Sequence, residues 1–81
     1  MEQQKELLLS DLKPGQRARI QKFTTEEIFL KLMEMGCLPG EEIEIIKIAP
    51  LNDPISISVA GYTLSLRLDE ARFIVVSTIN Y

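Results

Sequence analysis

Adjacent carboxylates are the side chains in this sequence whose types and spacing best suit chemistry. They occur at Glu26-Glu27, Glu41-Glu42 and Asp69-Glu70, and oxygen-only clusters of this kind suit Ca²⁺, Mg²⁺ or Mn²⁺. The chain has no histidine and one cysteine, so it cannot supply the nitrogen and sulfur ligands of a tetrahedral zinc site. The Glu26-Glu27 pair also has a structural explanation, because acidic side chains stabilise the first turn of a helix. We therefore expect no metal site.

The sequence lacks the residues that catalysis usually requires. The chain has no histidine base, and no serine lies in a strand-turn-helix elbow. Cys37 has neither histidine nor lysine beside it to lower its pKa, which favours a small buried hydrophobe. Ser56, Ser58 and Ser65 fit the outward faces of strands. We expect no catalytic residue and no cofactor, so the protein is not expected to be an enzyme.

Charge and composition disfavour nucleic-acid binding. The net charge is −3, from nine basic and twelve acidic residues, and gives no attraction to a polyanion. Phe23, Phe29 and Phe73 fall in core-like phase, which leaves Tyr62 and Tyr81 as stacking aromatics. No apolar run reaches the roughly 18 residues of a membrane helix, and the polar start is unlike a signal peptide. One cysteine excludes an internal disulfide and suits a reducing compartment, so we expect the cytoplasm.

Three apolar residues have no obvious role in the core. Leu38 follows a helix stop, Leu51 stands in a loop with two prolines, and Tyr62 follows a hairpin turn. Clustered exposed apolar side chains are typical of a protein-binding surface. If the fold brings Leu38, Leu51 and Tyr62 to one face, they would form a docking patch.

One helix is expected in the first half of the chain. Thr24-Thr25-Glu26-Glu27 fits a capping box with Thr24 as the N-cap. Apolar residues then recur at helical spacing over about a dozen residues. Gly36 ends the pattern and Pro39 prevents its continuation. Residues 1–9, before the first strand, are expected to form a flexible or helical arm.

The remaining sequence predicts β-structure. Strands are expected at residues 16–23, 42–48, 55–59, 62–66 and 73–76, with a short turn at 68–71. The alternation changes face near Ile46, which indicates a bulge, and Ala60-Gly61 fits a two-residue hairpin turn. About five strands and one helix favour a mainly β fold, a small β-barrel without exposed sheet edges. We assign residues 10–78 to this single domain and 79–81 to a C-terminal tail.

The order and spacing of several short motifs resemble the FeoA family of ferrous iron transport accessory proteins. The motifs, found between Leu9 and Val76, are Leu12-x-Pro14-Gly15, Leu32-x-x-Met35-Gly36-x-x-Pro39-Gly40, Ile43-Glu44-Ile45, Ala49-Pro50-Leu51-x-Asp53-Pro54, Val59-x-Gly61-Tyr62-x-Leu64-Ser65-Leu66-Arg67 and Glu70-Ala71. The family usually has Leu or Ile directly after the Met-Gly pair, where this chain has Cys37. That difference keeps a small apolar group.

The resemblance implies an SH3-like β-barrel with a helix inserted after the first strand. Members of the family are cytoplasmic and non-enzymatic, and they are thought to act beside FeoB, a membrane permease whose cytoplasmic part carries a GTPase domain. The same module also occurs as the C-terminal domain of iron- and manganese-responsive repressors. No helix-turn-helix domain accompanies it here, which favours a free-standing accessory protein.

From the resemblance we expect a small cytoplasmic accessory protein of ferrous iron uptake, a monomer or weak homo-oligomer. It would dock on the GTPase-containing part of the FeoB-type permease through an apolar patch or a strand edge. It would meet the membrane only through that permease and bind no nucleic acid. The expected partner contacts are Leu38, Leu51 and Tyr62. The alternative is a metal-responsive regulatory domain that binds a divalent transition metal through carboxylates such as Glu41 and Glu42.

Overall fold

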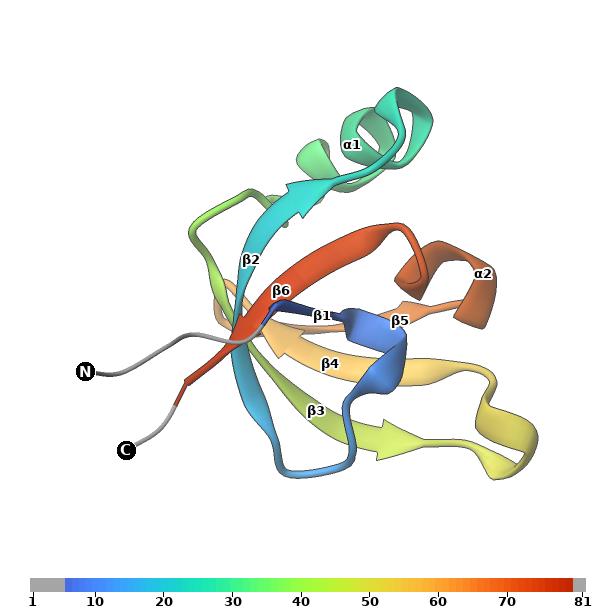
Figure 1. Cartoon of the computed structure of the whole chain (residues 1–81). Coiled ribbons are helices and arrows are strands. Elements are labelled where there is room, and N and C mark those ends of the chain that lie inside the picture. The colour runs from blue at the N-terminus through green and yellow to red at the C-terminus, as the bar shows by residue number, and fades with distance from the viewer. Residues whose placement is uncertain (1–5, 80–81) are drawn as a thin grey trace.

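The computed structural model describes residues 6–79 and folds them around one six-stranded antiparallel sheet (Figure 1). The strands are β1 (Glu6–Leu8), β2 (Arg17–Phe23), β3 (Glu42–Ile48), β4 (Ile55–Val59), β5 (Tyr62–Leu66) and β6 (Ile74–Thr78). The helices are α1 (Glu26–Met33) and α2 (Leu68–Ala71), and single 3₁₀ turns form η1 (Leu9–Asp11) and η2 (Pro50–Asn52). No helix of this described part is long and apolar enough to cross a membrane. The predicted mainly β fold with one main helix is confirmed, and the helix follows β2, the strand that was expected to be the first.

The core is the inner face of this curved sheet. Along β4, Ile55, Ile57 and Val59 are buried while Ser56 and Ser58 are only half-buried, as expected for a strand with one covered face. The same buried cluster takes side chains from every strand between β2 and β6 and from both helices. A single layer of aliphatic side chains thus holds all the elements together.

The N-terminal segment differs from the expected arm. Residues Glu6–Leu8 form β1, which pairs with β6 and places Leu7 opposite Val76, and Leu9 is buried in the core. The prediction of a flexible or helical arm is therefore wrong for residues 6–9, and residues 1–5 lie outside the described part. Three consecutive leucines show neither helical nor alternating periodicity, so their pairing depends on an edge that only the folded sheet provides.

The sheet curves around the core without pairing its first and last strands. In the sheet order, which covers the described residues, β1 neighbours only β6 and β5 neighbours only β4. Two edges therefore remain where closure was expected, and the sheet has six strands rather than five. The segments that follow these edge strands, η1 and α2, lie against each other. Short helical segments thus complete the barrel in place of a hydrogen-bonded seam.

The local signals for a bulge and a hairpin are confirmed. The register of β3 against β4 shifts between Ile45 and Lys47. Ile46 is 49% exposed and Lys47 is exposed beside it, while Ile48 packs against the core again. Ala60 and Gly61 have φ angles of 51° and 85°, which the two-residue turn of a tight hairpin requires.

Helix α1 begins one residue later than the capping-box pattern predicts. Thr25, not Thr24, is the N-cap, and its hydroxyl accepts a hydrogen bond from the Ile28 amide at 3.2 Å. The Thr24 amide instead donates to the Phe73 carbonyl at 2.8 Å, which draws Thr24 toward the sheet. The helix has eight residues rather than about a dozen, and the chain leaves it through Gly36 at a φ of 78°.

Glu70 connects the two helices. Its carboxylate forms an ion pair with Lys31 of α1 and accepts a hydrogen bond from the Arg67 amide at 2.9 Å. Burial raises the pKa of Glu70, but the bonds from Lys31 and Arg67 and their positive charges outweigh it, so the pKa lies below its ordinary value. This link accompanies a helix, α2, where the sequence predicts only a turn.

Replacing Leu32 with alanine tests how α1 is attached. Leu32 is fully buried, and with Ile28 it is one of the two buried residues of the helix. We expect the free energy of unfolding, measured by urea denaturation, to fall by about 3 kcal/mol from lost burial and a residual cavity. Leu30→Ala, at a position 48% exposed, should lower it by less than about 1 kcal/mol. Equal losses would contradict this attachment.

Replacing Glu70 with glutamine tests the link between the helices as a function of pH. Because the pKa of Glu70 is lowered in the folded protein, its contribution is present at neutral pH and is lost as the carboxylate becomes protonated. We expect Glu70→Gln to lower the free energy of unfolding by about 0.5–1 kcal/mol at pH 7. Denaturation series should show this difference shrinking between about pH 5 and pH 3. A difference that is constant over that range would argue against the ion pair.

Candidate docking surface

Leu51 is the most exposed large apolar residue of the described chain, with 94% of its surface accessible. It lies in η2, at the turn between β3 and β4, with a φ of 70° and a ψ of 14°. The left-handed region is disfavoured for a residue with a branched side chain and costs roughly 1–2 kcal/mol. Leu51 is therefore unfavourable in two respects: its backbone is in the left-handed region, and its apolar side chain is in contact with water.

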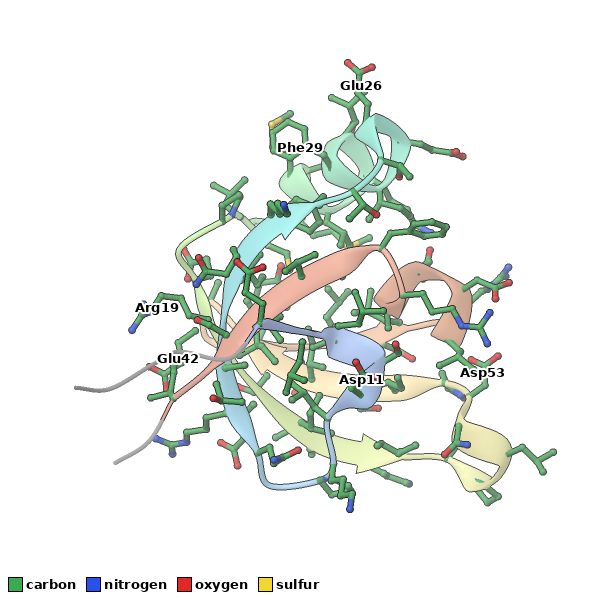
Figure 2. All side chains as sticks on the ribbon, in the orientation of Figure 1. Asp11, Arg19, Glu26, Phe29, Glu42 and Asp53 are labelled. Carbon is green, nitrogen blue, oxygen red and sulfur yellow. The ribbon has the colours of Figure 1, made fainter. Side chains whose placement is uncertain are left out.

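The loop that carries Leu51 is held at several points. The Ala49 amide donates to the Pro54 carbonyl at 3.0 Å, and the Asn52 amide donates to the Ala49 carbonyl at 2.9 Å. The Asp53 carboxylate accepts a bond from the Leu68 amide at 3.1 Å, and Figure 2 shows Asp53 between η2 and α2. The Asp53–Pro54 peptide bond is cis. These contacts hold the backbone around an apolar side chain that itself packs against almost nothing.

A shallow hollow of about 510 Å³ lies beside Leu51. Its walls come from η1 with the turn after it, from the end of β3, from η2 and from Leu68. Ile48 and Leu68 give it apolar surface, and Asp11 and Lys13 give it charges of both signs. An exposed side chain next to a partly apolar hollow is a common arrangement in protein-binding surfaces.

Leu38 and Tyr62 lie away from Leu51. Tyr62 pairs with Val59 at the end of β4, whereas Leu51 precedes the start of that strand, and five residues of strand span about 13 Å. A Cβ atom built on Gly36 would lie 3.8 Å from the Tyr62 hydroxyl oxygen, so Tyr62 lies beside the connection that carries Leu38. Leu38 is 37% exposed and Tyr62 is 38% exposed. The structure thus brings Tyr62 near the Leu38 connection and places Leu51 at the opposite end of β4.

The residues considered for metal binding are engaged elsewhere or lie apart. Within residues 6–79, no group of three or more Cys, Asp or Glu side chains could hold a metal ion. Glu42 forms an ion pair with Arg17 at 3.7 Å, and Glu44 faces the same guanidinium at 3.6 Å. The Arg19 side chain donates to the Gly40 carbonyl at 2.9 Å. Arg17 pairs with the carboxylates of Glu42 and Glu44, and Arg19 donates to a backbone carbonyl.

Cys37 is a core residue, as the sequence predicts. Its side chain is fully buried, and its amide donates to the Leu32 carbonyl at 3.0 Å at the end of α1. Burial, together with the negative charge of Glu41, raises the pKa of the Cys37 thiol to about 11. The thiolate is therefore scarce at neutral pH, which makes the side chain unsuited to nucleophilic or ligand chemistry.

Sequence reasoning missed two exposed apolar positions on α1. Leu30 and Met33 are 48% and 42% exposed. Phe73, assigned to core phase, is 39% exposed and precedes β6. A helical wheel of the eight observed residues would place Leu30 opposite Ile28 and Leu32, but the wheel depends on knowing where the helix begins and ends.

Comparisons of the sequence with known proteins identify the FeoA domain family. The model of the FeoA domain matches residues 7–78. A fusion protein of Fe(2+) transport protein A and the Fe(2+) transporter FeoB, from Porphyromonas gingivalis, is 36% identical over 73 residues, which is 89% of this chain. The chain spans 9% of the length of that fusion protein.

Solved structures show the same fold. The FeoA-like protein of Clostridium acetobutylicum is 33% identical, with a TM-score of 0.87 and coverage of 95% of this chain and 91% of that one. The FeoA protein of Stenotrophomonas maltophilia, a prokaryotic SH3 domain protein solved with zinc, is 27% identical. Its TM-score is 0.74, with 86% of this chain and 88% of that one covered. The SH3-like class expected from the sequence is thereby confirmed, and the chain belongs to the FeoA domain family.

Proposed function

We propose that this protein is a cytoplasmic accessory of ferrous iron uptake that docks on the GTPase-containing part of a FeoB-type permease. The P. gingivalis relative joins Fe(2+) transport protein A to FeoB in one polypeptide. Two modules encoded as one chain are held at a high effective concentration, an arrangement that serves partners acting side by side. The accessory would have no catalytic step of its own and would meet the membrane only through the permease.

The observation that carries the docking mechanism is the exposure of Leu51 on an anchored loop. Burying a leucine side chain in a partner contributes about 1.5–3 kcal/mol. Because hydrogen bonds already hold the backbone on both sides of Leu51, little ordering would be required on binding. We therefore assign Leu51 as the primary contact, with the adjoining hollow as the surface that a partner side chain enters.

Leu38 and Tyr62 would form a second, separate contact. Both lie near the connection between α1 and β3, and neither is as exposed as Leu51. A partner that touches both regions must span the length of β4, about 13 Å. The docking surface is accordingly proposed as two contacts at opposite ends of β4 rather than a compact patch.

Substituting Leu51 with glutamate tests the primary contact. We expect Leu51→Glu to weaken binding to the isolated cytoplasmic domain of the cognate permease at least tenfold, measured by calorimetry with and without a GTP analogue. The cause is the loss of leucine burial together with the cost of desolvating a carboxylate. The fold should persist, because the side chain contributes nothing to the core.

Two further variants separate docking from stability. Leu51→Gly removes the side chain but accepts the positive φ, so unfolding free energy should stay level or rise by up to about 1 kcal/mol while binding weakens. Ile46→Glu makes the same charge change at a residue 49% exposed on β3 and should leave binding intact. If Leu51→Glu binds like the parent protein, Leu51 is not the contact. Tight calorimetric binding of Mn²⁺ or Fe²⁺ in place of permease binding would favour the metal-responsive alternative.

A further inference from the structure

Helix α1 presents an apolar face to solvent as well as one to the core. Its inward face holds Ile28 and Leu32, the buried residues of the helix. On the outward face, Leu30 is 48% exposed and Met33 is 42% exposed. Residues three positions apart in a helix lie on one side of it. The helix therefore has apolar side chains on two opposite sides, which a surface helix with one core face does not require.

Aromatic contacts extend this outward surface. Phe29, which precedes Leu30 and lies four positions before Met33, is half-buried, with its ring centroid 5.8 Å from that of Phe23 on β2. The face formed by Phe29, Leu30 and Met33 is called the α1 face below. Leucine, methionine and phenylalanine together make an adaptable apolar surface, since the thioether side chain is flexible and polarisable.

Carboxylates surround the α1 face. Glu26, Glu27 and Glu34 lie on the helix or directly after it, and none of them forms an ion pair within the described residues. Figure 2 shows Glu26 projecting from α1 away from the sheet. The one cation of the helix, Lys31, is bound to Glu70. The negative charge around the apolar side chains is therefore not compensated on the helix itself.

We infer that the α1 face binds a basic amphipathic helix of a partner protein. Such a helix would set its apolar side chains against Phe29, Leu30 and Met33 while its lysines or arginines meet Glu26, Glu27 and Glu34. A second copy of this chain would bring the same carboxylates against each other. An anionic membrane surface would be repelled by them in the same way. Charge complementarity thus selects a cationic helical segment.

This surface is distinct from Leu51, the primary contact proposed for the permease; the second contact, at Leu38 and Tyr62, lies near the connection that follows α1. In Figure 1, α1 lies at the top of the molecule and η2, which carries Leu51, at the lower right. The α1 face and Leu51 are therefore widely separated. The inference does not depend on Leu51, and either surface can fail in an experiment without affecting the other.

A peptide of known composition tests the inference. The probe is a 14-residue amphipathic helix built from leucine and lysine, titrated into the full chain with amide chemical shifts recorded for each residue. We expect saturable binding with the largest shifts over residues 26–34. Leu30→Glu should weaken binding at least tenfold, although it adds a negative charge that attracts the peptide. Ile46→Glu adds the same charge at a similarly exposed residue of β3 and should leave binding unchanged or slightly tighter.

A loss of affinity for Leu30→Glu without a loss for Ile46→Glu distinguishes apolar docking from general attraction to an acidic protein. Met33→Gln, which changes no charge, should also weaken binding, and Leu51→Glu should not. Equal affinities for Leu30→Glu and Ile46→Glu would overturn the inference, as would shifts spread evenly over the surface. Equal binding of a leucine–glutamate peptide would do the same. Binding to phosphatidylglycerol vesicles without binding to the peptide would replace the inference with a membrane site.

Discussion

The constraint on which the structure depends is the single apolar layer inside one curved sheet. In 81 residues there is room for one such layer, because a chain of this size buries only roughly 60–65% of its unfolded surface. Ile43, Ile45 and Ile57 occupy that layer from neighbouring strands and are at most 1% exposed. The exposed apolar residues Leu51 and Leu30 lie outside this layer.

The same constraint decides which side chains are left outside. The register shift after Ile45 lets Ile48 pack against the core again, and it leaves Ile46 and Lys47 together on the outer face. Helix α1 turns Ile28 and Leu32 to the core, so Leu30, on the opposite side of the helix, is left in water. Ile46 and Leu30 are thus exposed because they lie on the outer sides of elements whose inner sides form the layer.

The sequence was informative wherever a signal acts over a few residues. The helix stop at Gly36, the hairpin at Ala60-Gly61 and the alternation of β4 are local in origin, and all of them appear as predicted. Pairing of Leu7 with β6 depends on a strand that lies some seventy residues later, so no local pattern reports it. Thr24 is not the N-cap, because its amide donates to the carbonyl of Phe73, the residue before β6.

For the candidate site, too, features set by neighbouring residues could be predicted from the sequence and features set by the fold could not. Exposure of Leu38, Leu51 and Tyr62 could be predicted, because loops and turns place side chains outside a core. Their separation could not, because it follows from the length and register of β4, which brings Tyr62 opposite Val59.

The separation of Leu51 from Leu38 and Tyr62 has an energetic consequence for binding. Association of two proteins costs at least about 4 kcal/mol in lost translational and rotational freedom, whereas one buried leucine returns about 1.5–3 kcal/mol. Leu51 alone therefore cannot sustain a complex, and neither can a single residue at the Leu38 connection. A partner must engage the hollow beside Leu51 or reach a second contact along the hairpin, or it must be covalently attached, as in the P. gingivalis fusion protein. A covalent linkage of that kind removes most of the association cost, so contacts as weak as the one proposed for Leu51 would suffice.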